Sequence, residues 1–70
     1  MSNVKVNTSK ITDIVLSCDI NSEDKLFVAR FGDSEIIFET HSKDVHCSDI
    51  YCSLDDAIKF AEAIIQLAKQ

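Results

Sequence analysis

Hydrophobic periodicity changes once along the chain, and this change constrains the fold more than any other feature. Between Ile11 and about Cys52, apolar residues recur close to every second position, and from Leu54 onward they recur with a helical spacing. Alternation is typical of half-buried strands, and a period of about 3.6 residues is typical of an amphipathic helix. The sequence therefore predicts a group of strands followed by one C-terminal helix.

Four strands are expected in the alternating region, at 11–20, 25–31, 34–40 and 45–51. The segments between them are polar and rich in Asn, Asp, Ser and Gly, which favour turns. Val4 and Val6 either extend the first strand or form a frayed edge. The expected fold is α+β, a four-stranded antiparallel meander with one C-terminal helix packed on one face (ββββα).

The dipeptide Gly32-Asp33 predicts how the second and third strands pair. Glycine in the first central position is typical of a type II′ turn with a two-residue loop. Such a loop places Arg30 opposite Glu35 and divides the side chains between two faces. The predicted core face carries Phe27, Ala29, Phe31, Ile36 and Phe38. The other face, which carries Leu26, Val28 and Ile37, is then left open and bordered by the Arg30–Glu35 pair.

The C-terminal part of the chain predicts one irregularity and one helix. The imperfect alternation of the fourth strand is reconciled by a β-bulge near Ser48-Asp49. Ser53, with Asp56 three residues later, approximates a capping box, so the helix should begin after Ser53 and run to about Lys69. Its apolar arc is wider than the stripe that one sheet face covers, which leaves a flank that includes Phe60, Ala63 and Leu67.

The length of 70 residues predicts a single domain, residues 1–70. A domain this short buries only about 60% of the surface that its unfolded chain exposes, so its own core is marginal. Small domains of this kind are stabilised by disulfides, a metal, idealised packing or a partner chain.

Composition excludes several classes of function. The net charge is −5 and the seven basic residues are scattered, which disfavours direct binding to nucleic acid or to an anionic membrane. The N-terminal residues contain no signal-peptide pattern, and no apolar run approaches the roughly 18 residues of a membrane span. Three cysteines, an odd number, argue against a secreted disulfide framework, so a cytoplasmic location is expected.

Few residues in the sequence could form a catalytic or metal-binding site. Zinc ligands could come from His41, His46, Cys47 and Cys52, but their spacing matches no familiar zinc signature. The alternative interpretation is two surface histidines and two half-buried thiols, with no metal and no cofactor. No cleft is expected that would join a nucleophile to a base, so the chain is not expected to be an enzyme.

The surplus apolar surface is the strongest functional signal in the sequence. It indicates a non-enzymatic protein-binding module, either an inhibitor or an adaptor whose acidic rim complements a basic partner. Small acidic anti-defence (anti-CRISPR-like) inhibitors of phages and mobile elements share this size and charge, and the analogy rests on those two properties alone. The alternatives are a structural homo-oligomer such as a homodimer, and a small zinc or thiol protein. The expected partner-binding residues are Leu26, Val28, Arg30, Glu35, Ile37, Phe60, Ala63 and Leu67.

Overall fold

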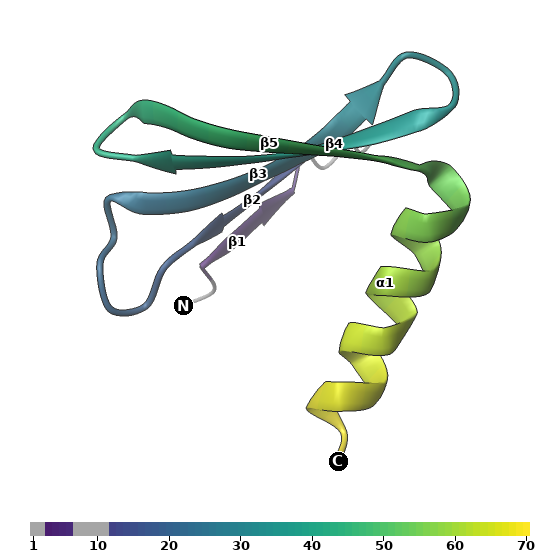
Figure 1. The fold of residues 1–70 in the computed structure, drawn as a ribbon. Coiled ribbons are helices and arrows are strands. Elements are labelled where there is room, and N and C mark those ends of the chain that lie inside the picture. The colour runs from purple at the N-terminus through teal and green to yellow at the C-terminus, as the bar shows by residue number, and fades with distance from the viewer. Residues whose placement is uncertain (1–2, 7–11) are drawn as a thin grey trace.

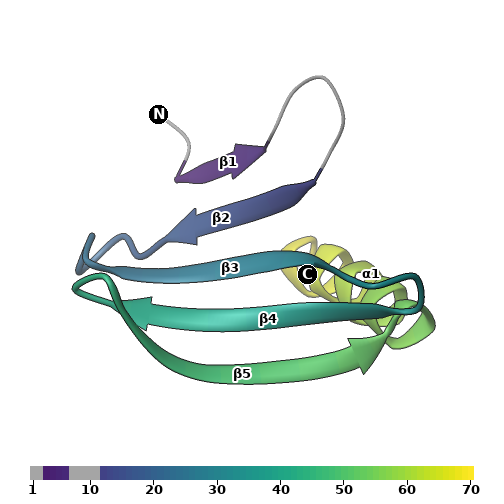
Figure 2. The same cartoon turned by 90° about the horizontal axis from the view of Figure 1, so that it is seen from above.

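A computed structural model describes residues 3–6 and 12–70 of the chain. The described elements are β1 (Val4–Val6), β2 (Asp13–Ser17), β3 (Asp24–Phe31), β4 (Glu35–Ser42), β5 (Val45–Ser53) and α1 (Leu54–Ala68). The strands form one antiparallel sheet in the order β1-β2-β3-β4-β5, so every strand pairs with its neighbour in sequence (Figures 1 and 2). The expected α+β meander with a C-terminal helix is confirmed.

The sheet has five strands, and the prediction of four was wrong. Val4 and Val6 belong to a separate strand, β1, in which Val4 pairs with Leu16 and Val6 with Ile14. The strand expected at 11–20 is shorter, because β2 ends at Ser17 and Ile20 is 97% exposed beyond it. Ile11, where that strand was expected to begin, lies outside the described residues.

The β3–β4 hairpin turns through three residues, 32–34, and not through two. Phe31 therefore pairs with Glu35 and Arg30 with Ile36, so the predicted pairing of Arg30 with Glu35 was wrong. Because side chains alternate along a strand, a shift of one residue exchanges the faces of β4 relative to β3. The positive φ that a type II′ turn requires of its first central residue is present at Gly32, at +68°. A positive φ in the first loop residue is compatible with either loop length, and it did not decide between them.

The β4–β5 hairpin has a tight turn and a bulge. Lys43 and Asp44 both have positive φ values, 53° and 63°, as both central residues of a type I′ turn require. Further along, Thr40 pairs with Ser48 and His41 with His46, which leaves Cys47 as the extra residue of a bulge. The sequence placed this bulge near Ser48-Asp49, so the irregularity exists but lies slightly earlier in the strand.

The helix α1 begins where the sequence predicts. The Ser53 hydroxyl accepts a hydrogen bond from the Asp56 backbone N–H at 3.1 Å, which confirms Ser53 as the N-cap. Asp55 and Asp56 lie in the first turn, where the helix dipole favours negative charge. No loop separates β5 from α1, since Ser53 is both the last strand residue and the cap.

The register gives the sheet two apolar faces. We call the side toward α1 the helix-side face; it includes Val4, Ile14, Leu16, Leu26, Val28, Ile36, Phe38 and Ile50. We call the opposite side the far face; it includes Val15, Phe27, Ala29, Phe31, Ile37 and Tyr51. The core face predicted from sequence is therefore split, because Phe27, Ala29 and Phe31 lie on the far face while Ile36 and Phe38 lie on the helix-side face. Likewise Ile37 does not share a face with Leu26 and Val28.

Burial is slight in both layers. Ile37, on the far face, is the one apolar residue that is buried in the described part of the chain, at 8% exposure. Tyr51 pairs with Ile37 from β5, and its ring meets that of Phe31 edge to face with centroids 5.0 Å apart. On the helix side, α1 leaves the end of β5 and runs away from the sheet (Figure 1), and among the described elements it lies close only to β4 and β5. No residue of α1 is buried.

The exposed area measures how incomplete this packing is. The chain exposes 5773 Å², about 1,400 Å² more than the roughly 4,400 Å² expected for a folded monomer of 7.8 kDa. The radius of gyration of 12.8 Å likewise exceeds the value of about 11 Å expected for this length. The isolated chain therefore exposes more surface than a typical monomer of its mass, and large apolar residues such as Ile58, Phe60 and Leu67 contribute to that surface.

Backbone strain, and not steric crowding, governs substitution at Gly32. A Cβ built there meets no atom within 4 Å, so the penalty of a side chain comes from the positive φ alone. We expect Gly32→Val to lower the free energy of unfolding by at least about 1–2 kcal/mol, the range for an L-residue in the left-handed region. Gly32→Asn should cost less, because asparagine tolerates this region. Urea unfolding of the two variants provides the measurement, and equal midpoints would contradict the backbone geometry of this loop.

The cap makes a second stability prediction. Ser53→Ala removes the acceptor for the Asp56 N–H and should lower the free energy of unfolding by about 0.5–2 kcal/mol. Ser53→Asp keeps an acceptor at the same position and serves as the control, with stability near that of the wild type. Helix content from circular dichroism during thermal unfolding reports both variants. An alanine variant as stable as the aspartate variant would show that the hydroxyl does not act as a cap.

Candidate functional site

A concave surface lies between α1 and the helix-side face of the sheet, and we call it the apolar groove. Its volume is about 570 Å³. It is lined by Val4, Ile14, Leu16, Leu26, Val28, Arg30, Ile36, Phe38, Leu54, Ala57, Ile58, Phe60, Ala61 and Ile64. Four strands and the helix thus contribute to one surface.

Simple periodicity explains why these residues meet. The sheet residues of the groove all occupy even-numbered positions of strands whose side chains alternate, so they project from the same side. On α1, Leu54, Ala57, Ile58, Ala61 and Ile64 follow the three- and four-residue spacing of one helix stripe. The edge-to-face pair of Phe38 and Phe60, with ring centroids 5.8 Å apart, links the two walls.

A second hollow continues the groove toward β5. It has a volume of about 400 Å³ and shares Leu26, Phe38 and Phe60 with the groove. Charged groups are few along this surface, namely Arg30 and Asp56. Arg30 donates from Nη2 to the Asp33 carbonyl oxygen at 3.0 Å. Removing apolar surface of this kind from water is favoured by about 25 cal/mol per Å².

The expected partner-binding residues are divided by this geometry. Leu26, Val28, Arg30 and Phe60 come together along the groove. Ala63 and Leu67 lie on α1 but are not among the lining residues, and Leu67 is 69% exposed. Glu35 and Ile37 were misplaced by the register error, since they lie on the far face with Phe31 and Ala29 as their partners.

Sequence reasoning missed several groove residues for identifiable reasons. Ile36 and Phe38 were assigned to the covered core because the loop was taken to be one residue shorter. Val4, Ile14 and Leu16 alternate correctly, and their pairing could have been inferred from the matching alternation of β1 and β2. No sequence signal indicated that α1 would stand away from them.

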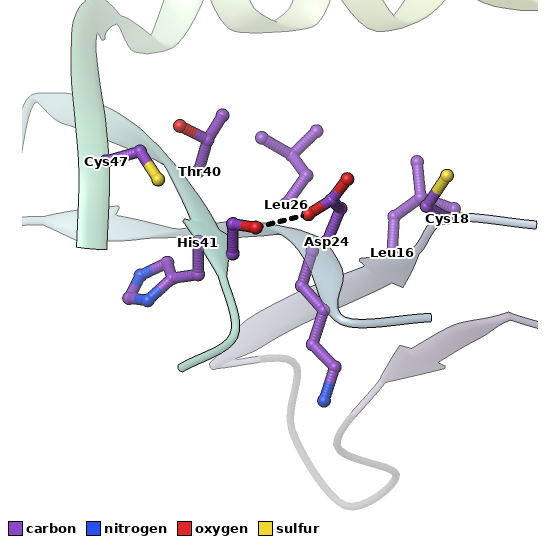
Figure 3. A pocket seen from close by; sticks show the side chains of 9 residues that line it. Leu16, Cys18, Asp24, Leu26, Thr40, His41 and Cys47 are labelled. Carbon is purple, nitrogen blue, oxygen red and sulfur yellow. Dashed lines mark hydrogen bonds between the residues drawn. The ribbon is translucent and has the colours of Figure 1, made fainter. Parts of the chain in front are cut away.

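A third hollow, of about 490 Å³, lies at the end of the sheet where β2 meets β3 and β4 (Figure 3). The Ser42 hydroxyl donates to Asp24 Oδ1 at 2.5 Å and joins the ends of two strands. Figure 3 shows that Thr40 and Cys47 lie toward the helix side while the His41 ring points away from them. This hollow is therefore shallow, and it does not bring the Cys47 thiol to the His41 imidazole.

The four residues considered as zinc ligands are likewise divided between the two faces. His41 pairs with His46 on the far face, and their ring centroids are 5.3 Å apart. Cys52 pairs with Ile36 and lines the hollow on the helix side. Cys18, Cys47 and Cys52 are all free thiols, and none of them forms a disulfide.

Two carboxylates accompany the histidines on the far face, and we call Glu39, His41, His46 and Asp49 the histidine–carboxylate cluster. His41 Nε2 lies 3.0 Å from Glu39 Oε1, and His46 Nε2 forms a short hydrogen bond with Asp49 Oδ1. This hydrogen bond raises the pKa of His46 above its ordinary value, because the Asp49 carboxylate favours the protonated ring. The ring of Phe27 supports the cluster from β3, with its centroid 4.6 Å from that of His41.

No family model matches the sequence, and neither a curated protein nor a solved structure matches it. Over the described part of the chain, no helix is long and apolar enough to cross a membrane.

Proposed function

We propose that the chain is a non-enzymatic protein-binding module that acts through the apolar groove. The observation that carries this proposal is the excess of exposed area, about 1,400 Å² above that of a complete monomer of this mass. A standard protein–protein interface buries about 800 Å² on each partner, so the excess is large enough for a stable complex. Groove residues such as Ile58 and Ile64 are about half exposed, which leaves area to bury.

A second copy of the chain is the first occupant that we propose for the groove. Each chain carries both an apolar helix stripe and an apolar sheet face, so two copies related by a two-fold axis offer each other complementary surfaces. The net charge of −5 opposes association, but the charged residues that line the groove and the hollow that continues it are only Arg30 and Asp56. Repulsion therefore falls mainly on the solvated surface, where salt screens it.

An inhibitor or adaptor that binds a different protein is the second candidate, and the acidic surface favours it. Twelve acidic residues against seven basic ones would complement a basic patch on a partner and speed its association. The lack of a convergent nucleophile and base along the groove supports a binding role over an enzymatic one. We place this activity in the cytoplasm, consistent with the three free thiols.

Association through the groove makes a prediction about oligomeric state. Sedimentation velocity of the full chain at micromolar concentrations should show a dimer. Ile64→Asp places a charge in the groove lining, at a residue that is 48% exposed. We expect this variant to raise the Kd of the dimer at least about tenfold, because an unpaired charge buried in the interface costs several kcal/mol. The far-face variant Tyr51→Asp, at the same 48% exposure, is the matched control and should stay dimeric.

Circular dichroism of both variants separates loss of association from loss of folding. A wild-type chain that remains monomeric across the concentration series would exclude the homodimer and leave the second candidate. A dimer that Tyr51→Asp disrupts and Ile64→Asp does not would place the interface on the far face and contradict the proposal.

A further inference from the structure

The far face of the β4–β5 hairpin carries an unusual arrangement of charged and ionisable groups. Glu39 pairs directly with Asp49 across the strands, and His41 pairs with His46 in the adjacent row. Like charges directly opposite each other destabilise a sheet, so a positive charge close to both carboxylates would stabilise this pair. Glu39, His46 and Asp49 bring one imidazole and two carboxylates close together, and His41 lies beside Glu39.

The bulge at Cys47 is what brings His46 into this set. If the ladder continued regularly from the Thr40–Ser48 pair, His41 would pair with Cys47 and His46 would point to the helix side. The bulge instead leaves Cys47 unpaired and returns His46 to the far face, where it reaches Asp49. Bulges recur where a side chain must be redirected at a functional site.

Three of the four residues already have ligand atoms close enough together for a single ion. A Zn–N distance of about 2.0–2.1 Å implies ligand atoms about 3.3 Å apart in a tetrahedral site. His41 Nε2 and Glu39 Oε1 lie 3.0 Å apart, and the ligand atoms of Glu39, His46 and Asp49 all lie within 4.8 Å of one another. His41 contacts Glu39 but lies outside this group of three, so its side chain would have to rotate to become a fourth ligand.

We propose that the histidine–carboxylate cluster binds a divalent transition-metal ion of the Zn²⁺ class. Imidazole nitrogens select such ions over Mg²⁺ and Ca²⁺, which prefer sites made of oxygen alone. The ion neutralises the opposed carboxylates and ties β4 to β5. This site keeps both histidines that the sequence singled out and replaces the two cysteines with Glu39 and Asp49. It lies on the face opposite the apolar groove and does not depend on the proposed association.

Isothermal titration calorimetry of Zn²⁺ into the full chain, free of any affinity tag, tests the proposal. We expect one ion per chain with micromolar or tighter affinity, and no binding of Mg²⁺ under the same conditions. His46→Gln and Asp49→Asn should each weaken Zn²⁺ binding at least about tenfold, since the loss of an outer-shell partner alone costs about 10–100-fold. Cys47→Ser and Cys52→Ser are the matched controls and should leave the affinity unchanged.

Cobalt substitution identifies the ligands independently of affinity. Co²⁺ bound by nitrogen and oxygen gives no thiolate charge-transfer absorption, and we expect none. A site of micromolar affinity would be filled at a Zn²⁺ concentration of about 100 µM. Absence of binding at that concentration would overturn the proposal. Loss of binding in Cys47→Ser or Cys52→Ser, or a thiolate band with Co²⁺, would overturn it as well. Circular dichroism establishes that each variant is folded, and the use of two ligand variants covers the case in which one is not.

Discussion

The pairing register of β3 with β4 is the constraint on which the rest of this structure depends. These two long strands occupy the middle of the ladder, so their register fixes which side chains share a face across the sheet. With a three-residue loop, Val28 lies opposite Phe38 and Ala29 opposite Ile37. Each face therefore receives an apolar row, whereas a chain with one C-terminal helix can cover only one face with its own residues. Exposed apolar surface follows from the topology itself.

The junction between β5 and α1 determines how little of the helix-side face is covered. Ser53 ends the strand and caps the helix, so no loop residue is available to turn the helix back along the sheet. The chain has no proline, and its single glycine lies in another hairpin. Leu54 and Ala57, in the first turns, are half-buried, and every later residue of α1 is exposed. The apolar groove is thus the consequence of a direct strand-to-helix connection.

Local signals in the sequence correctly predicted the features that depend only on interactions between residues close together in the chain. The change of period, the Ser53 cap and the positive φ of Gly32 depend on neighbouring residues, and the structure has all three. The loop length at Gly32 depends on which face is more favourably covered, which is a property of the whole sheet. The candidate sites were likewise predictable only in part. Leu26 and Phe60 could be identified from the sequence as surplus apolar residues. The neighbours Ile36 and Phe38, and the carboxylates beside His46, became apparent only with the register.

The β4–β5 hairpin contributes residues to both proposed surfaces, which lie on opposite faces of the sheet. Phe38 and Ile50 pair across the strands on the helix-side face, and Glu39 and Asp49 pair in the next row on the far face. A polypeptide that filled the groove and the hollow that continues it would pack against β4 and β5, whose opposite side carries the cluster. The two proposed sites share no residue, because alternate residues of these strands project to opposite faces of the sheet. Both sites nevertheless depend on the same strand registers, which place the apolar rows on one side and the carboxylates beside the histidines on the other.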